Sequence, residues 1–165
     1  MRVKQYNRGE VIKYAEKWAM RRNPKYYNFD PVGGDCTSFA SQSIYAGTGI
    51  MNYNKYGWYY RSGYDKSPSW SGVEYLYNFL VNNKGIGPFG RKIEIGEIEK
   101  GDVIQLSFDG NIYHHSLLVV DIPNNIKTLS NIRIATHTED AYNRKLSTYT
   151  YDEIRFIKID GVRIY

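Results

Sequence analysis

The chain has 165 residues and a mass of 19.2 kDa, with 42% hydrophobic and 24% charged residues. These proportions suit a single domain, residues 1–165, with one hydrophobic core, and they exclude a disordered or collagen-like chain. Basic residues exceed acidic residues by 22 to 17, which favours anionic partners. No long basic stretch, helix-turn-helix, zinc finger or ribonucleoprotein motif accompanies this excess, so we expect no specific nucleic-acid partner.

The apolar runs of the sequence are short. Residues 117–120 form one of the longest, far below the roughly 20 residues needed to cross a bilayer, so we expect no membrane insertion. The basic start at residues 1–6 is not followed by an apolar segment, so the pattern of a secretory signal is missing. We therefore expect either a protein that stays in the cell that makes it or a chain from which a leader or partner domain was removed.

The first half of the chain predicts helices. Over residues 7–22 the apolar residues lie on one helical face, with Asn7 as N-cap, Glu10 as its capping-box partner, and Asn23-Pro24 as the stop. A second helix is predicted from Cys36 to Ala46, and Gly47 is expected to close it.

Residues 48–70 have no hydrophobic period and are rich in Gly, Asn, Ser and Tyr, which indicates a long irregular segment of functional use. A third helix is predicted to open at Ser71 or Gly72 and to end at residues 82–85.

The second half of the chain predicts short strands. They cover residues 101–106, 113–120, 132–137, 154–159 and 162–165. Residues 108–111 are the expected hairpin turn between the first two strands, and residues 123–125 open the next connection. Because helices precede strands, the order predicts an α+β domain with an antiparallel sheet packed on the early helices.

Cys36 is the single cysteine, so it forms no intramolecular disulfide and is either a buried apolar residue or a reagent. It follows Gly33-Gly34-Asp35 at the start of a predicted helix, where backbone N–H groups and the helix dipole favour a thiolate. A thiolate nucleophile needs a base, and histidine suits that role near neutral pH.

Three histidines are available as the base: His114, His115 and His137. Because side chains alternate along a strand, only one of the adjacent pair can face the helix that bears Cys36, and the pattern does not decide which. The strands bearing His115 and His137 are expected to be neighbours. A Cys-His-His zinc site lacks the close ligand spacing of structural zinc sites, so we expect no metal.

Six blocks of sequence carry a family resemblance. They are residues 33–42, 57–60, 68–70, 101–106, 114–120 and 136–140, which include Gly-Gly-Asp-Cys-Thr and His-His-Ser-Leu-Leu. In this order they resemble the signature of the bacterial putative amidase-domain family, which is similar to the NlpC-type and CHAP cell-wall peptidases. The resemblance runs from about Tyr6 to the C-terminus, and it implies the papain-like cysteine peptidase fold.

The resemblance implies a nucleophile, a base and an orienting residue. Carried over, Cys36 is the nucleophile, His115 the base on the second strand, and His137 the group that orients the imidazole. Related families place Asn, Asp or Glu at the third position, so Glu139 and Asp140 are alternatives.

The oxyanion would be held by the Cys36 backbone N–H and a neighbouring donor, with Asp35 or Tyr27 as candidates. A thioester mechanism at such a site requires no metal or organic cofactor.

The relatives implied by the resemblance cut amide bonds in bacterial peptidoglycan, between muramic acid and the stem peptide or within the peptide. A basic, Tyr-rich surface suits such an anionic polymer, and further wall-binding domains would lie outside this chain. The site of action would be the bacterial cell wall, reached by a phage-type lysin or by the excised domain of a secreted protein. Aromatic and polar residues expected to contact substrate are Tyr27, Trp58, Tyr59, Tyr60, Trp70 and His114.

Other functions remain open from the residues. Trp58 and Trp70 fit a hydrophobic core as well as a cleft, since Trp is largely buried on average. A catalytically silent wall-binding module would keep the aromatic surface, although the retained cysteine and histidines argue against it. An acyltransferase or deamidase on the same fold would use the same residues with a different acceptor or substrate.

Overall fold

The computed structural model describes all 165 residues as an α+β domain. The helices are α1 (Arg8–Trp18), α2 (Cys36–Thr48), α3 (Pro68–Ser71) and α4 (Val73–Asn82). The strands of the main sheet are β1 (Arg2–Lys4), β4 (Gly87–Ile93), β5 (Val103–Ser107), β6 (His115–Asp121), β7 (Arg133–Thr136), β8 (Ala141–Lys145) and β9 (Glu153–Ile164). A separate hairpin consists of β2 (Tyr60–Ser62) and β3 (Asp65–Lys66).

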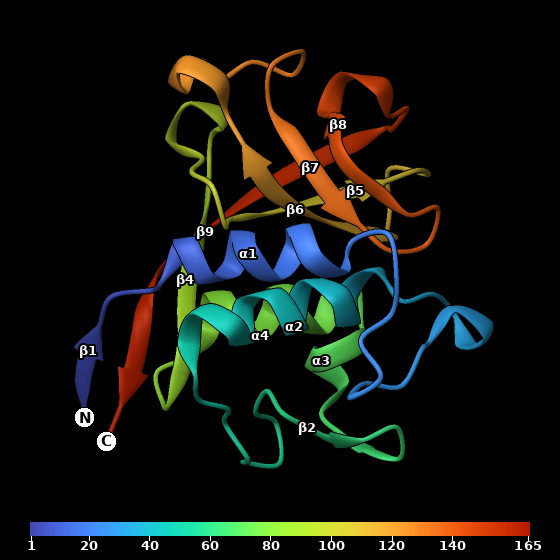
Figure 1. The fold of residues 1–165 in the computed structure, drawn as a ribbon. Helices are drawn as coiled ribbons and strands as arrows, with labels where there is room; N and C mark the ends of the chain where they lie inside the picture. The colour runs from blue at the N-terminus through green and yellow to red at the C-terminus, as the bar shows by residue number, and fades with distance from the viewer.

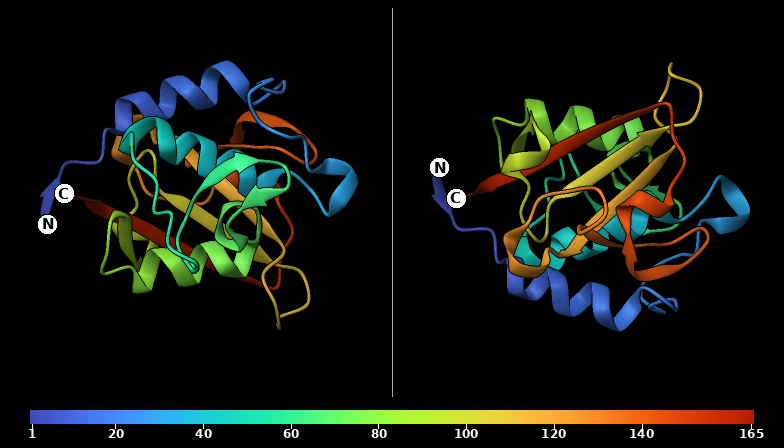
Figure 2. Two further views of the ribbon diagram at one scale, coloured as in Figure 1. Left: turned by 90° about the horizontal axis from the view of Figure 1, so that it is seen from below. Right: turned by 90° about the horizontal axis from the view of Figure 1, so that it is seen from above.

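The main sheet is antiparallel throughout, in the order β1-β9-β5-β6-β7-β8, with β4 also paired to β9. Helices α1 and α2 lie across one face, and the two termini are adjacent because β1 pairs with the end of β9 (Figure 1). In both views of Figure 2, α2 lies between α1 and α4. The α+β class and the antiparallel sheet predicted from the order of elements are thus confirmed.

The sheet buries apolar side chains on both faces, in keeping with the alternation along its strands. On β6, Leu118 and Val120 join the cluster that includes the helices, whereas Leu117 and Val119 join a second cluster on the opposite face. The second cluster is closed by residues outside the helices, such as Leu146 beyond β8. No helix has the length and apolar character that spanning a membrane requires.

The start of α1 is as predicted, but its capping box is not formed. Asn7 caps the helix, its Oδ1 accepting a hydrogen bond from the Glu10 backbone N–H at 3.2 Å. The Glu10 carboxylate pairs with Lys13, and the Asn7 N–H donates to the Gly47 carbonyl of α2 instead. The regular helix ends at Trp18, before the predicted end at residue 22.

The predicted end of the second helix is wrong by two residues. Gly49, with φ of 66°, caps α2 through its N–H to the Tyr45 carbonyl. Gly47 lies within the helix, where α1 crosses closely: a Cβ built on it would lie 2.4 Å from Val11 Cγ2 and 2.8 Å from the Asn7 carbonyl oxygen. The glycine at 47 is therefore required by helix packing and not by helix termination.

Replacing Gly47 by Ala is expected to lower the free energy of unfolding by about 1–3 kcal/mol, because the added methyl group forces α1 and α2 apart. Chemical denaturation measures the change. Gly96→Ala is the matched control, since no atom lies within 4 Å of a Cβ built there. Equal stability of the two variants would show that the helices do not approach as closely as described.

The strands predicted between residues 101 and 137 are confirmed as β5, β6 and β7, with the expected hairpin turn between β5 and β6. The predicted strands at 154–159 and 162–165 are one strand, β9. Strands β1, β4 and β8 were not predicted. The segment over residues 48–70, expected to be irregular, contains the β2–β3 hairpin and α3.

Candidate active site

Cys36 is the first residue of α2 and is buried, with 7% of its surface exposed. Helix α2 packs on β6, and the Thr37 hydroxyl lies 2.9 Å from the Ser116 hydroxyl of that strand. The Ser116 backbone lies close enough to the Cys36 thiol to lower its pKa. The thiol therefore contacts β6 at the residue that follows His115.

The Cys36 thiol has a raised pKa in this setting. Burial is the main cause, and the Asp35 carboxylate adds to it, while hydrogen bonds from Ser116 and Thr37 oppose it. The helix start alone predicts the opposite direction, so burial outweighs the helix dipole here. Near neutral pH the Cys36 side chain is therefore a protonated thiol, which would need a base to remove its proton before it could act as a nucleophile.

His115 opens β6 and is 9% exposed. Its burial, together with the Arg144 guanidinium, lowers its pKa to about 4. The imidazole is therefore neutral near pH 7, with one ring nitrogen free to accept a hydrogen bond. No hydrogen bond joins Cys36 to His115 in this structure, as is common in catalytic pairs without substrate.

Two residues missed by the sequence analysis complete the surroundings of His115. The Tyr149 ring lies 5.9 Å from the His115 ring, centroid to centroid, and the Arg144 guanidinium lies over the Tyr149 ring at 3.8 Å. Burial raises the pKa of Tyr149, the neighbouring Arg144 guanidinium opposes this shift, and Glu139 and Cys36 make the smallest additions to it. Tyr149 thus packs on His115 and lies near enough to Cys36 for the two groups to interact electrostatically.

The hydroxyl of Tyr149 is buried and has no hydrogen-bond partner. A buried phenol without a partner is costly, and in native proteins it calls for an explanation. Arg144 lies in β8 and Tyr149 follows the turn after it. The sequence predicted no strand in this segment, so neither residue was a candidate for the site.

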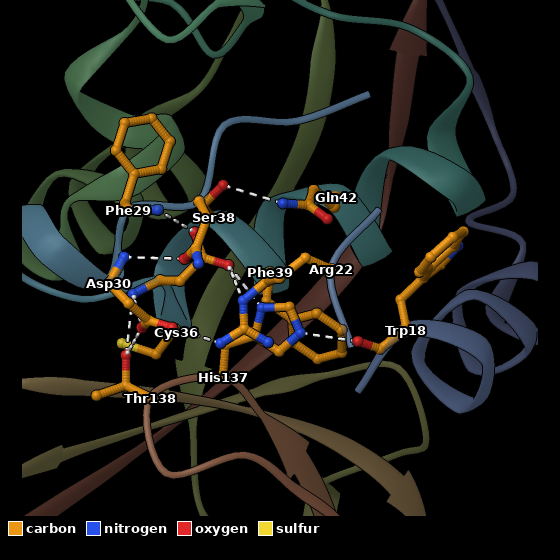
Figure 3. Close-up of polar contacts among 12 residues, drawn as sticks. Trp18, Arg22, Phe29, Asp30, Cys36, Ser38, Phe39, Gln42, His137 and Thr138 are labelled. Carbon is orange, nitrogen blue, oxygen red and sulfur yellow. Dashed lines mark hydrogen bonds and ion pairs between the residues drawn. The ribbon is translucent and has the colours of Figure 1, made fainter. Parts of the chain in front are cut away.

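His137 is fully buried and bonded to groups other than His115. Its Nδ1 lies 2.6 Å from Asp35 Oδ2 and its Nε2 lies 2.8 Å from the Trp18 carbonyl oxygen, while its ring stacks on Phe39 at 4.2 Å (Figure 3). Both partners are hydrogen-bond acceptors, and together they fix the orientation of the ring. His137 thus joins the ends of α1 and α2 to the sheet, and these contacts do not support the orienting role predicted for it.

Asp35 fastens the loop before α2. Its Oδ1 accepts from the Phe29 N–H at 2.9 Å, and its own N–H donates to the Thr138 hydroxyl at 2.9 Å. With its carboxylate held by Phe29 and His137, Asp35 positions the start of α2. An acceptor of this kind does not stabilise an oxyanion, so its predicted oxyanion role is not supported.

The alternatives at the third position do not contact His115 either. Asp140 forms an ion pair with Arg22 at 2.7 Å, and Arg22 also pairs with Asp30. Glu139 lies exposed in the turn after β7, with φ of 58°. Asp140 therefore belongs to the same anchoring network as Asp35, and no side chain hydrogen-bonds to the His115 ring.

Two of the residues predicted to contact substrate are core residues. Trp58 and Trp70 are fully buried and pack against each other with ring centroids 5.0 Å apart. Trp58 donates from Nε1 to the Ser41 hydroxyl of α2 at 3.1 Å. The cleft interpretation of both is wrong, because a side chain without exposed surface cannot contact a substrate.

The remaining predicted contact residues reach the surface. Tyr27 is 45% exposed and Tyr59 and Tyr60 are half-buried, with the Tyr60 hydroxyl accepting a hydrogen bond from the Tyr27 N–H at 2.7 Å. His114 is partly exposed and stacks on Phe108 at 5.5 Å. Substrate contact by these four stays a prediction. No cluster of three or more His, Cys, Asp or Glu side chains is arranged to hold a metal ion.

The buried neutral His115 makes stability depend on pH. Its folded pKa of about 4 lies below the ordinary value of 6.5, so between these values the unfolded chain takes up a proton that the folded protein excludes. The free energy of unfolding is expected to fall by up to about 3 kcal/mol as pH decreases from 6.5 to 4.

Denaturation at several pH values measures this dependence, and His115→Gln should flatten it. His114→Gln is the control, since it alters the adjacent histidine. A pH dependence unchanged in His115→Gln would contradict the burial of a neutral imidazole at this position.

Comparison with known proteins places the chain in a family. A family model described as the putative amidase domain matches residues 5–159. The protein named "Uncharacterized protein YhbB" of Bacillus subtilis (strain 168) is 33% identical over 123 residues, which cover 72% of this chain and 38% of that protein. The chain thus spans less than half the length of this relative. No solved structure matches the chain. Since the family model covers nearly all of its residues, the chain belongs to the putative amidase domain family.

Proposed function

We propose that this chain is a cysteine-dependent hydrolase of amide bonds in bacterial peptidoglycan. The observation that carries the proposal is the position of Cys36 at the start of α2, beside the strand that bears a buried, neutral His115. Membership of the amidase family fits an amide substrate. The cell-wall substrate, the papain-like fold and the likeness to NlpC-type and CHAP peptidases rest on the sequence resemblance.

The reaction would proceed in two halves at Cys36. His115 removes the thiol proton as sulfur attacks the amide carbonyl, and the resulting imidazolium returns that proton to the leaving amine, which leaves a thioester. Water then loses a proton to His115 and attacks the thioester, and the proton passes to the Cys36 sulfur as the acid departs. Proton and bond changes balance within the Cys36–His115 pair and water.

The negative oxygen formed in each half would have two donors. Backbone N–H groups in the first turn of a helix lack intrahelical partners, and Cys36 supplies one of them. The unpartnered hydroxyl of Tyr149 would be the second. Tyr27, suggested from the sequence, would then contact substrate instead.

A wall substrate is supported by the charge of the chain, with 22 basic and 17 acidic residues, because the polymer is anionic. The site of action would be the bacterial cell wall. Since the chain matches 38% of the YhbB protein, wall-binding domains elsewhere in a longer protein fit the proposal.

Mass spectrometry of purified peptidoglycan incubated with the protein tests the proposed function. We expect soluble fragments with new termini, on muramic acid for an amidase or on the stem peptide for an endopeptidase. Fragments that persist with Cys36→Ala would contradict the cysteine mechanism. Fragments bearing a transferred acyl group, with no new acid, would identify an acyltransferase instead.

Tyr149→Phe should separate stability from catalysis. Removing a buried hydroxyl that lacks a partner is expected to leave the free energy of unfolding unchanged or to raise it by up to about 1 kcal/mol. Loss of an oxyanion donor is expected to lower turnover by about 10²-fold. Peptidoglycan turnover and thermal melting measure both effects, with Tyr151→Phe as control. Unchanged turnover would remove Tyr149 from the mechanism.

A further inference from the structure

A surface hollow of about 820 Å³ lies away from the candidate active site. It is formed by the segment after α2, residues 52–57, and by the exposed side of α4 with the turn that follows it. Figure 2 shows this segment running from the end of α2 down to α4. Neither Cys36 nor His115 lines the hollow, so it requires an explanation of its own.

Two asparagines, Asn52 and Asn83, hold the frame of the hollow through hydrogen bonds from their side-chain amides to the backbone. Asn52 donates to the Ile86 carbonyl at 2.9 Å and accepts from the Asn54 N–H. Asn83 donates to the carbonyls of Ile86 and Pro88 and accepts from the Gly85 N–H. These bonds tie the segment after α2 to the turn after α4, so the hollow is preformed.

Inside this frame, four polar side chains have no internal hydrogen bond: the amides of Asn54 and Asn78 and the hydroxyls of Tyr56 and Tyr75. The two tyrosines are unusually open, at 82% and 61% exposure. The buried Phe79 also lines the hollow and stacks on Trp58 at 6.3 Å, giving it an apolar floor. The combination is an aromatic surface edged by free amides.

The charge of the hollow is positive. Lys55 and Lys84 line it, and no acidic residue does. A ligand with carboxylate groups would therefore be attracted to it.

We propose that the hollow binds a saccharide chain that carries carboxylate groups. A sugar ring offers an apolar C–H face that stacks on Tyr56 and Tyr75, and hydroxyl pairs that match the donor and acceptor of an Asn amide. The carboxylates would pair with Lys55 and Lys84. This site is independent of the chemistry proposed for Cys36, because binding there requires no bond cleavage.

Binding of peptide-free glycan strands prepared from peptidoglycan tests the site, because these strands carry carboxylates but no stem-peptide amide. Isothermal titration calorimetry compares the wild-type chain with Tyr56→Ala/Tyr75→Ala, which we expect to weaken binding at least about 10-fold. Tyr64→Ala is the matched control, since Tyr64 is fully exposed and lies outside the hollow. Its affinity should equal that of the wild type.

Two further probes separate sugar recognition from charge. Lys55→Gln/Lys84→Gln should weaken binding of the glycan strands but not of the neutral hexamer of N-acetylglucosamine. Polyglutamate, which has charge without sugar, should bind more weakly than the strands, and the tyrosine substitutions should not change its affinity. The proposal is overturned if the wild type binds neither saccharide, if the tyrosine pair has no effect, or if polyglutamate binds as well as the strands.

Discussion

Cys36→Ala is expected to lower kcat/KM for amide hydrolysis by at least about 10⁴-fold while the protein stays folded. The substitution removes the sulfur that would form the thioester and leaves a small side chain at the start of α2. Product release from peptidoglycan, followed at equal folded concentrations, measures the loss.

His115→Gln supplies the test that the two residues act together. We expect a loss of about 10³-fold or more, because the thiol has a raised pKa and needs a base. In the double variant the losses should not add, since a base without a nucleophile has nothing to activate. Additive losses, or a His115→Gln enzyme of normal rate, would show that the thiol is activated by another group.

His137→Ala is expected to lower the free energy of unfolding by about 3–5 kcal/mol. The substitution leaves the buried Asp35 carboxylate without its 2.6 Å partner, frees the Trp18 carbonyl and opens a cavity beside Phe39. Chemical denaturation measures the change. The effect on turnover per folded molecule should be much smaller than that of His115→Gln.

Two conservative variants distinguish anchoring from orienting at this position. His137→Asn would keep a polar group near Asp35, and His137→Gln would keep one near the Trp18 carbonyl, so each should recover part of the lost stability. If instead all three variants are stable and lose turnover about 10²-fold, His137 orients the catalytic base as the sequence resemblance suggests.

The sequence predicted the elements whose patterns are local. The apolar face of α1, the Asn7 cap and the start of α2 at Cys36 follow from residues close together in the chain, and the structure contains all three. Gly47 was misread because its glycine requirement arises from Val11 on another helix. Strands β1, β4 and β8 were missed because each is short or polar, and β1 and β4 pair only with β9, far along the chain.

The candidate site shows the same difference between features set by local sequence and contacts set by distant residues. Cys36 and His115 were singled out from a single thiol, a helix start and a strand histidine, and their catalytic roles stay predictions. The contacts of His137 were not predicted, because alternation places its ring on the helix-facing side with Ala135, where it contacts Phe39 and Asp35. Its role in orienting a base stays a prediction. Tyr149 could not be predicted as a site residue, because no local sequence pattern indicates that a tyrosine hydroxyl will lack a hydrogen-bond partner.

Trapping the thioester at Cys36 tests the central claim most directly. The protein is mixed with peptidoglycan, quenched in acid during turnover, and digested for peptide mass spectrometry. We predict that the peptide containing Cys36 carries an acyl group that neutral hydroxylamine removes, and that the His115→Gln variant accumulates far less of it. Product formation at the wild-type rate by Cys36→Ala, with no adduct on the wild type, would contradict the cysteine mechanism.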